Sequence, residues 1–316
     1  MNIYIYFDMN HIIDNIKFQL WRLIYGPIFS WRYWRCRHVR RSFHVLNSYD
    51  TIKFIVNNRC SVSRFGDGEL AMIYHFLDGG NASNFYIDSF QSYSEKLAEK
   101  LYRILLSNNS NLLVSIPYPI VSVDEYKGLD KIFWQRFTIL DINRFKTLLS
   151  DKQVYGNSCF TRFYLNHKKT DFNYYVSTLK GIWDNLNICV VEGENSRLGV
   201  RNDLFANAKS IHRILCPTIN AFEKYDKILS VIEANARHDL YLIALGHTAT
   251  VLASDLSELG LWAIDIGHID IEYEWYLRRA KRKIVIPDKY INEIDEGRKI
   301  INCSDITYEH EIIARV

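Results

Sequence analysis

Apolar and polar residues follow one another in blocks along the chain, and the blocks predict alternating strands and helices. Between the apolar runs, apolar residues recur at helical spacing. One helix is expected to follow the capping-box pattern of Ser92–Glu95, and another runs from Thr248 to a stop at Gly260. Four short apolar runs bounded by turn residues predict buried strands: Leu112–Ile116, Ile188–Val191, Leu240–Leu245 and Leu261–Ile266.

The order of these elements predicts the fold class. Strand, glycine turn, helix and strand over 240–266 make a βαβ unit. Such units favour an α/β protein with a Rossmann-like, mainly parallel sheet flanked by helices. Ligands of these sheets bind beyond the carboxyl ends of the strands, so polar segments at those ends are the first places to look for chemistry.

Composition and charge divide the chain into three predicted segments: a basic, aromatic N-terminal extension (1–48), a catalytic domain (49–285) and a polar C-terminal tail (286–316). With 48% hydrophobic and 24% charged residues, the chain has an ordinary soluble composition. Its net charge of +3 is too small to predict nucleic-acid binding. No apolar run approaches the roughly 20 residues that span a bilayer. The scattered cysteines predict neither a zinc site nor a disulfide framework, so a cytoplasmic location is expected.

The extension has an unusual charge pattern. It carries no Asp or Glu between Asn15 and Tyr49, while seven Lys or Arg residues alternate with Trp21, Trp31 and Trp34. Tryptophan and arginine together favour an anionic membrane surface, which predicts a peripheral position at the inner leaflet. Packing of the tryptophans on the catalytic domain and binding of RNA remain the alternatives.

The segment SVSRFGDGEL, Ser61–Leu70, has the pattern of a site for a metal ion and a phosphate. Asp67 and Glu69 are two residues apart, so in an extended segment both carboxylates leave one face and suit Mg²⁺ or Mn²⁺. A helix follows, and its N-terminus together with Arg64 would favour a phosphate. The two intervening glycines, Gly66 and Gly68, would let a ligand approach the backbone. A glycine turn with an acidic helix cap is the alternative interpretation.

Three further polar segments follow predicted strands. Val190–Phe205 carries Ser196 and Arg197, which either bind a ligand or lie in a solvated loop. Leu245–Thr250 places Gly246 and Thr248 at a helix start, where they favour phosphate or an ordinary cap. Asp265–Trp275 crowds four carboxylates around His268, a costly density unless the groups are solvated, paired or metal-bound.

Several long segments, taken in order, resemble the GT-D fold glycosyltransferase family over about 52–279: SVSRFGDGEL, GNSCFTRFYL, VVEGENSRLGVRNDLF, CPTINAF and GHTATVLASDLSELGLWAIDIGHIDIEYEW. The resemblance implies a bacterial, metal-dependent transferase that uses a nucleotide sugar, typically UDP-linked, in surface polysaccharide or glycoprotein glycan assembly. It carries the Asp-x-Glu metal motif onto Asp67 and Glu69. Two departures are visible: His247 stands where the family commonly has Pro, and Arg201 where it commonly has Gly.

A mechanism follows from these residues. Breaking a sugar–phosphate bond develops negative charge on the leaving diphosphate, which a metal at Asp67 and Glu69 would stabilise together with Arg64 and Arg197. A carboxylate must take the acceptor proton if the anomeric centre inverts. Asp270 and Glu272 are the predicted catalytic bases, with Asp265 and Glu274 as substitutes.

The predicted partners are a UDP-hexose donor and a glycan or lipid-linked glycan acceptor, and no nucleic acid is expected. Residues predicted to bind the nucleotide sugar are Arg64, Gly66, Gly68, Ser196, Arg197, Gly246, Thr248 and His268. A metal-dependent phosphohydrolase would use the same carboxylates and phosphate site without an acceptor. A non-catalytic nucleotide or polyanion binder would rely on the extension.

Overall fold

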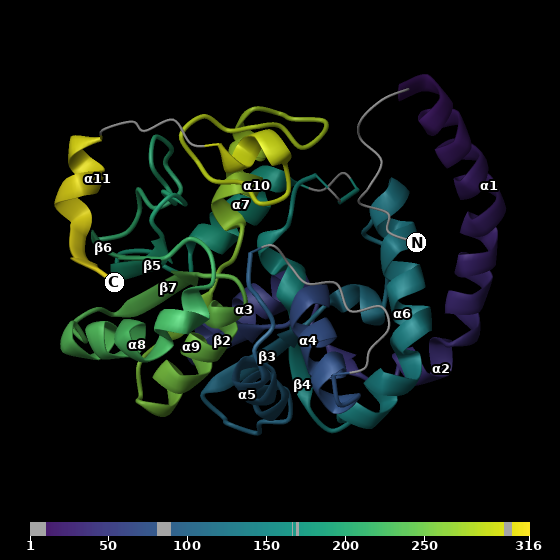
Figure 1. Ribbon diagram of the computed structural model, residues 1–316, viewed down its shortest axis with the longest axis horizontal. Coiled ribbons are helices and arrows are strands. Elements are labelled where there is room, and N and C mark those ends of the chain that lie inside the picture. The colour runs from purple at the N-terminus through teal and green to yellow at the C-terminus, as the bar shows by residue number, and fades with distance from the viewer. Residues whose placement is uncertain (1–10, 81–89, 166, 169–170, 300–304) are drawn as a thin grey trace. The chain divides into compact units, whose positions relative to one another are not determined.

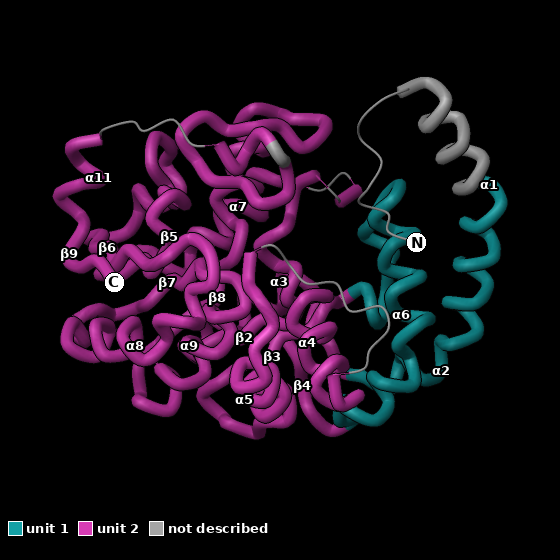
Figure 2. The backbone as a smooth tube through the Cα atoms, in the orientation of Figure 1, with its two compact units in different colours: residues 1–43, 119–151 teal, residues 44–118, 152–316 magenta. Residues whose placement is uncertain are grey.

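The structure is a computed structural model that describes residues 11–80, 90–165, 167–168, 171–299 and 305–316; at 11–22 and 295 it describes the backbone alone. The chain forms two units, residues 1–43 with 119–151 and residues 44–118 with 152–316 (Figure 2). These limits differ from the three predicted segments. Residues 119–151, predicted inside the catalytic domain, group with the N-terminal extension, and the predicted polar tail supplies a strand to the sheet.

The larger unit contains a nine-stranded sheet in which every recorded strand pair is parallel (Figure 1). The prediction of a Rossmann-like, mainly parallel sheet is therefore confirmed. In spatial order the strands of the described chain are β1 (His44–Val45), β4 (Val154–Asn157), β3 (Leu112–Ile116), β2 (Ser61–Arg64), β8 (Ala263–Asp265), β7 (Leu240–Ala244), β5 (Asn187–Gly193), β6 (Ser210–Cys216) and β9 (Ile312–Arg315).

Helices cover both faces of this sheet, and strand β2 shows how. Val62 points into a core shared with Ile52 and Leu179, whereas the Ser63 hydroxyl, on the opposite face, donates to the Thr250 carbonyl at 2.7 Å. The helices of this unit are α3 (Ser48–Asn58), α4 (Asp67–Leu77), α5 (Glu95–Leu105), α7 (Phe172–Lys180), α8 (Tyr225–Ala234), α9 (His247–Glu258), α10 (Ile269–Leu277) and α11 (Ile306–Glu311). Short 3₁₀ turns are η1 (Tyr118–Ile120), η2 (Ser158–Thr161), η3 (Ala221–Lys224) and η4 (Asp295–Arg298).

The apolar pattern predicted these elements closely. The four predicted strands correspond to β3, β5, β7 and β8, and β7 pairs in parallel with β8 through α9, as expected of the βαβ unit. The capping prediction for α5 was two residues early, because Ser94 rather than Ser92 accepts the bond from the Leu97 N–H. The described cysteines are free thiols. Cys303 lies outside the described residues.

The sheet order identifies the edge at which a ligand is expected. Strand β8 lies between β2 and β7. Strands β3 and β4, which follow β2 in sequence, extend from it in one direction, while β7, β5 and β6 extend in the other. The carboxyl ends of β2 and β8 therefore flank a topological switch point, where α/β proteins bind their ligands.

The smaller unit is helical and consists of α1 (His11–Arg35), α2 (Arg37–Arg40) and α6 (Gly128–Leu148). Tyr33 of α1 packs with Ile139 of α6 and Val123, and its hydroxyl donates to the Pro119 carbonyl at 2.7 Å. Arg40 lies over the Tyr33 ring and donates to the Tyr33 carbonyl at 3.1 Å. Within the described residues, no helix has the length and hydropathy that crossing a membrane requires.

Candidate active site

Ser61–Leu70 forms strand β2 and the first turn of helix α4. The helix starts at Asp67, and the Glu69 carboxylate turns back to accept a hydrogen bond from the Gly66 N–H at 2.8 Å. The expectation that Asp67 and Glu69 lie in an extended segment and leave one face is therefore wrong. Successive helical residues turn by about 100°, so side chains two apart point to nearly opposite sides. Glu69 caps the N-terminus of α4, as the alternative interpretation of a glycine turn with an acidic helix cap predicted.

Solvent reaches Asp67 at the start of this helix. The protein around this side chain still removes much of its hydration, and this desolvation and the Glu69 carboxylate raise the pKa of Asp67. The charges of Arg162 and His247 oppose the shift. A bound cation would relieve both effects, because it neutralises the ionised form of the carboxyl group.

Arg64 leaves the carboxyl end of β2 and crosses to the end of β8. Its Nη1 donates to Thr161 Oγ1 at 2.6 Å and to the Ser158 carbonyl at 2.9 Å, and its Nη2 lies 3.1 Å from Asp265 Oδ1. Its buried Nε has no hydrogen-bond partner among the described residues. Gly267 has a φ of +45°, a left-handed conformation that favours glycine, and a Cβ there would come within 1.8 Å of Arg64 Nη2.

Asp265 ends β8 and is almost fully buried. Burial raises its pKa to about 6, although the Arg64 charge opposes the shift; the Glu69 carboxylate adds to it. Asp265 Oδ1 accepts from the Gly267 N–H at 3.0 Å, and Oδ2 accepts from the Thr250 hydroxyl at 3.3 Å. Both oxygens of this carboxylate are therefore engaged.

The N-terminus of α9 contributes the third side of the site. Gly246 has a φ of +54°, and a Cβ there would meet the Phe90 ring at 2.4 Å. Thr248 is buried, and its hydroxyl donates to Gln91 Oε1 at 3.5 Å. The His247 ring lies against Gly68, where a Cβ would come within 2.7 Å of Nε2. We call Arg64, Asp67, Glu69, His247 and Asp265 the switch-point cluster.

A group of cations extends this cluster. Arg162 forms an ion pair with Glu293 at 2.5 Å, and Lys283 lies 2.5 Å from the same carboxylate. Burial, together with the charges of Arg162, Arg64 and Lys283, lowers the pKa of His268 to about 4 against the opposing charge of Glu293. His268 is therefore neutral near pH 7 and suited to donate a hydrogen bond rather than a charge.

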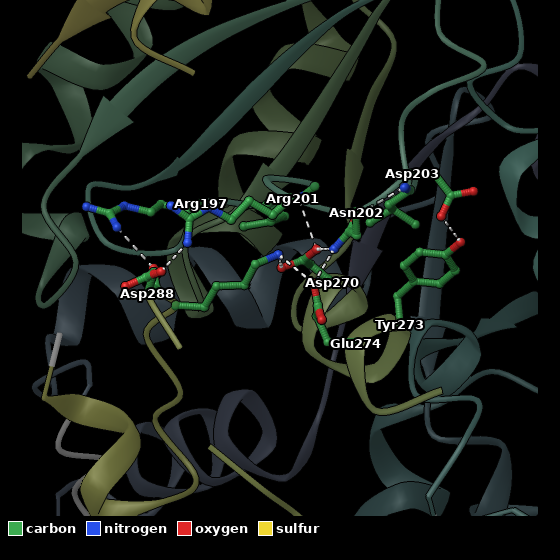
Figure 3. A network of polar contacts seen from close by, with 12 residues as sticks. Arg197, Arg201, Asn202, Asp203, Asp270, Tyr273, Glu274 and Asp288 are labelled. Atoms are coloured by element: carbon green, nitrogen blue, oxygen red, sulfur yellow. Dashed lines mark hydrogen bonds and ion pairs between the residues drawn. The ribbon is translucent and has the colours of Figure 1, made fainter. Parts of the chain in front are cut away.

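A second cluster lies on α10 and is closed (Figure 3). Asp270 accepts from Asn202 Nδ2 at 2.8 Å and from the Gly199 N–H at 2.9 Å, and Lys289 Nζ lies 2.6 Å from its other oxygen. Glu274 accepts from the same Asn202 amide at 2.7 Å and lies 3.3 Å from the same Lys289 amine. Both acids and the lysine are buried. We call Asn202, Asp270, Glu274 and Lys289 the α10 cluster.

Glu272 lies between the two acids in sequence but has different surroundings. Its Oε2 accepts from the Tyr164 N–H at 3.1 Å and the Leu165 N–H at 3.4 Å. Burial raises the pKa of Glu272 to about 7, and the Glu293 carboxylate adds to this shift. The Arg162 charge and the two backbone hydrogen bonds oppose it. A carboxyl group with a pKa near the working pH is suited to proton transfer.

The loop after β5 places Arg197 beside a pocket of about 210 Å³. Arg197 Nη1 donates to the Asp288 carbonyl at 3.3 Å, and Arg201 Nη1 lies 2.5 Å from Asp288 Oδ2 (Figure 3). All three residues have left-handed backbone, with φ of 50°, 60° and 66° in chain order. Ser196 is half-buried in the same loop, and its N–H donates to the Gly193 carbonyl at 2.8 Å.

The structure thus divides the predicted residues between different contact networks. One group surrounds the carboxyl ends of β2, β7 and β8: Arg64, Gly66, Asp67, Gly68, Glu69, Gly246 and Thr248. His268 follows β8. Ser196, Arg197 and Asp270 belong to the contacts of the loop after β5. Sequence reasoning did not single out Arg162, Lys283 and Glu293, because each stands alone in sequence and joins the site through tertiary contacts.

Solved structures with the same fold identify the class of protein. The chain is similar to one described as a domain of unknown function 1792 with a distinct glycosyltransferase fold, at 36% identity and a TM-score of 0.80 over 90% of this chain and 99% of that one. It is also similar to a glycosyltransferase of the same domain type from Streptococcus sanguinis, at 30% identity and a TM-score of 0.77 over 87% of this chain and 99% of that one.

Residues 62–294 match the glycosyltransferase GT-D fold family, and the chain belongs to that family. The resemblance and enzyme class predicted from sequence are therefore confirmed. Glycosyltransferase GlyD of Streptococcus pneumoniae serotype 4 is 33% identical over 84% of this chain, and the probable glycosyl transferase Gly of Streptococcus gordonii is 31% identical over 87%. These alignments cover only 32% and 39% of the relatives' lengths, so the chain matches about a third of each.

Proposed function

We propose that this domain transfers a hexose from a UDP-linked sugar to a glycan acceptor, in bacterial surface polysaccharide or glycoprotein glycan synthesis. The observation that carries the proposal is the switch-point cluster, in which the solvent-reached Asp67 and the partly unpaired Arg64 lie at the carboxyl ends of β2 and β8. The donor would bind there, since this edge is the ligand-binding edge of the fold.

The leaving diphosphate is the group that most needs stabilisation. Arg64 has an unpaired Nε among the described residues and is held rigidly by Thr161 and Asp265. Donors fixed in advance stabilise developing charge without reorganising during the reaction. Arg162 supplies a second guanidinium, and neutral His268 a hydrogen-bond donor. Together they would bind the diphosphate.

A divalent cation, Mn²⁺ or Mg²⁺, fits these residues. The part of the chain that the structure describes holds no group of three or more His, Cys, Asp or Glu side chains arranged around one ion. Such ions in phosphate sites commonly use one or two carboxylates and complete their coordination with phosphate oxygens and water. Asp67, which solvent reaches, would supply one carboxylate, and Glu69 could supply a second only by leaving its contact with the Gly66 N–H. The bound ion would stabilise charge on the leaving diphosphate.

Glu272 is the proposed base among the predicted catalytic carboxylates. Its pKa of about 7 allows it to accept the proton of an acceptor hydroxyl at physiological pH. Asp270 was predicted for the same role, but its contacts with Lys289, Asn202 and Gly199 support a structural one. The two assignments are separated by the Glu272→Gln and Asp270→Asn variants: loss of transfer with the fold intact identifies the base.

A donor panel tests the function. The purified chain is incubated with UDP-hexoses and glycan acceptors, with and without Mn²⁺, and release of UDP and phosphate is followed. Release of UDP that requires both Mn²⁺ and an acceptor supports transfer. Phosphate release that ignores the acceptor would identify a phosphohydrolase, and retention of UDP without turnover would identify a nucleotide-binding protein.

A membrane surface is the proposed location of this activity, and helix α1 supports it. Among the described residues of α1, Tyr25 and five other large apolar side chains are exposed. Tyr25 lies outside an arc of about 140°, at 100° per residue, that holds the other five: Leu23, Ile24, Ile28, Trp31 and Trp34. Tyr33, on the opposite side, is buried. Arg35 and Arg37 lie over the Trp31 and Trp34 rings. We call this arc the α1 face.

The positive charges of Arg35 and Arg37 beside the α1 face favour an anionic bilayer as the surface that it binds. Tryptophans settle at the headgroup level, and each basic residue near an anionic surface contributes about 1 kcal/mol. We expect the full chain to float with vesicles containing phosphatidylglycerol, and salt to release it. Substituting Trp31 and Trp34 by Ala should abolish flotation, whereas Leu140→Ala, at another exposed apolar residue, should not. Equal flotation of all three proteins, or none, would reject the bilayer.

A further inference from the structure

An open groove of about 610 Å³ lies beside helix α10 and has no assigned role. Its volume is in the range of small-molecule sites, and it shares no lining residue with the pocket beside Arg197. We call it the aromatic groove, because its lining combines three aromatic rings with polar side chains: Tyr164, Phe172 and Tyr276 with Asp171, Asn173 and Arg279. A pyranose ring needs such a surface, since it has C–H faces and a rim of hydroxyl groups.

The three rings hold one another in place. Tyr164 meets Phe172 and Tyr276 edge to face, with ring centroids 5.1 and 5.9 Å apart. The Tyr276 hydroxyl donates to Asn173 Oδ1, which fixes that ring further. All three rings are half-buried, so part of each surface stays open to solvent. The negative face of an aromatic ring attracts C–H bonds, and a surface fixed in advance loses little freedom on binding.

Polar groups of the groove have hydrogen-bonding capacity left. Arg279 is exposed, and its guanidinium has no hydrogen bond or ion pair within the part of the chain that the structure describes. Asp171 is exposed too, and its Oδ1 accepts from the Tyr174 N–H at 3.0 Å, which leaves Oδ2 for a ligand. A carboxylate accepts from a hydroxyl group and a guanidinium donates to one. The two side chains together therefore match the hydroxyls of a sugar.

The groove adjoins the proposed base. Tyr276 follows Glu272 by four residues on α10, so both side chains leave the same face of the helix. The Tyr164 N–H donates to Glu272 Oε2 at 3.1 Å. Thr161, which accepts from Arg64 at 2.6 Å, stands three residues before Tyr164, and three residues span at most about 11 Å. A ligand in the groove would therefore lie close to both the base and the switch-point cluster.

We propose that the aromatic groove binds a pyranose ring of the glycan acceptor. The inference rests on the proposed function, which supplies the donor and the base, and deepens it by giving the acceptor a site of its own. The sugar would stack on Tyr164, while Asp171 and Arg279 bind its hydroxyls. One hydroxyl would give its proton to Glu272 as its oxygen bonds to the anomeric carbon of the donor. The bond from that carbon to the diphosphate oxygen breaks, and the electron pair leaves with the diphosphate.

Three substitutions change the groove in different ways. Tyr164→Ala removes a ring but keeps the backbone N–H that donates to Glu272. Tyr164→Phe keeps the ring and removes only its hydroxyl. Arg279→Gly removes the guanidinium at a position with a φ of +52°, where glycine fits well. Tyr174→Ala, at an exposed tyrosine of α7 outside the groove lining, is the matched control. Circular dichroism and thermal melting establish that each variant is folded.

The test is saturation-transfer NMR with the methyl glycosides of glucose, galactose and their N-acetylated amino sugars, without donor or metal. The wild type, Tyr164→Phe and Tyr174→Ala should bind at least one of these saccharides alike. Tyr164→Ala and Arg279→Gly should each weaken its binding about 3- to 10-fold. Addition of UDP and Mn²⁺ should leave the saccharide bound. In transfer assays, Tyr164→Ala should raise the acceptor KM and leave the donor KM unchanged.

The outcomes separate the inference from the proposed function. Failure of every saccharide to bind the wild type, or unchanged binding in both Tyr164→Ala and Arg279→Gly, overturns the acceptor groove. Displacement of the saccharide by UDP overturns it too, because the sugar then occupies the donor site. Weaker uridine binding in Tyr164→Ala would instead assign the groove to the base of the donor. Saccharide binding that responds to the variants as expected, without any release of UDP in the donor panel, rejects transfer and leaves the saccharide site standing.

Discussion

The switch-point cluster and the α10 cluster are both rich in charge, yet they differ in how far their polar atoms are paired. In the α10 cluster, Lys289 and Asn202 each bridge Asp270 and Glu274, and Arg278 occupies the second oxygen of Glu274. In the switch-point cluster, Arg64 Nε and both nitrogens of His247 have no hydrogen-bond partner among the described residues.

The difference separates two uses of buried charge. A closed network holds segments together: the α10 cluster ties α10 to the loop after β5 and to the segment around Lys289. An open cluster keeps donors and acceptors ready for a ligand, at some cost to stability. Density of charge in sequence therefore predicts a site less well than the presence of unused polar atoms.

The largest effect is expected from opening the closed network. Lys289→Met leaves Asp270 and Glu274 buried without their shared amine, which should lower the free energy of unfolding by about 3–5 kcal/mol. Arg278→Met is the matched control, because Arg278 pairs with the same Glu274 but is half-exposed, and it should cost less than about 1 kcal/mol. Guanidinium unfolding measures both. Equal, small losses would mean that the network is not stabilising.

The switch-point cluster should show the reverse pattern, with a large loss of activity and little change in the free energy of unfolding. Asp67→Asn should reduce Mn²⁺-dependent transfer about 100-fold or more, while changing the free energy of unfolding by less than about 0.5 kcal/mol because the side chain is exposed. Asp226→Asn removes another exposed first-turn acid, from α8, and should leave both quantities unchanged. Near-normal turnover of Asp67→Asn with Mn²⁺ would show that the metal site is elsewhere.

The sequence predicted the sheet well because buried parallel strands are apolar runs, and a run such as Leu112–Ile116 marks its own ends. It predicted the site only in part. The geometry of Glu69 depends on where α4 begins, and spacing alone cannot distinguish an extended pair from a helical turn. The pairing of Asp270 depends on Lys289, whose contact with α10 is tertiary. The same holds for Arg162, which reaches Glu293 across the fold.

A smaller effect is expected from pH. The folded-state pKa of Glu272 is about 7, above the usual value near 4.3, so the folded state binds more protons between these pH values. Stability should therefore fall as pH rises from about 4.5 to 7, by roughly 2–3 kcal/mol from this group. Glu272→Gln should flatten that slope in urea unfolding measured across the range. If Glu272 is the base, transfer by the wild type should rise through pH 7; an unaltered slope in the variant would contradict the raised pKa.

The smallest effect concerns Arg197, which lies outside both clusters. Its side chain is half-buried beside the pocket of about 210 Å³ and, among the described residues, makes one hydrogen bond, to the Asp288 carbonyl, so its guanidinium keeps donors for a ligand. Arg197→Ala should weaken UDP-sugar binding by about threefold to tenfold, or 0.7–1.4 kcal/mol, in calorimetric titrations with Mn²⁺. Arg201→Ala, which removes the other arginine at Asp288, is the matched control and should have less effect because Arg201 is half-exposed and paired with the carboxylate. Unchanged donor affinity in Arg197→Ala would assign this residue to a solvated loop and confine the donor to the carboxyl ends of β2 and β8.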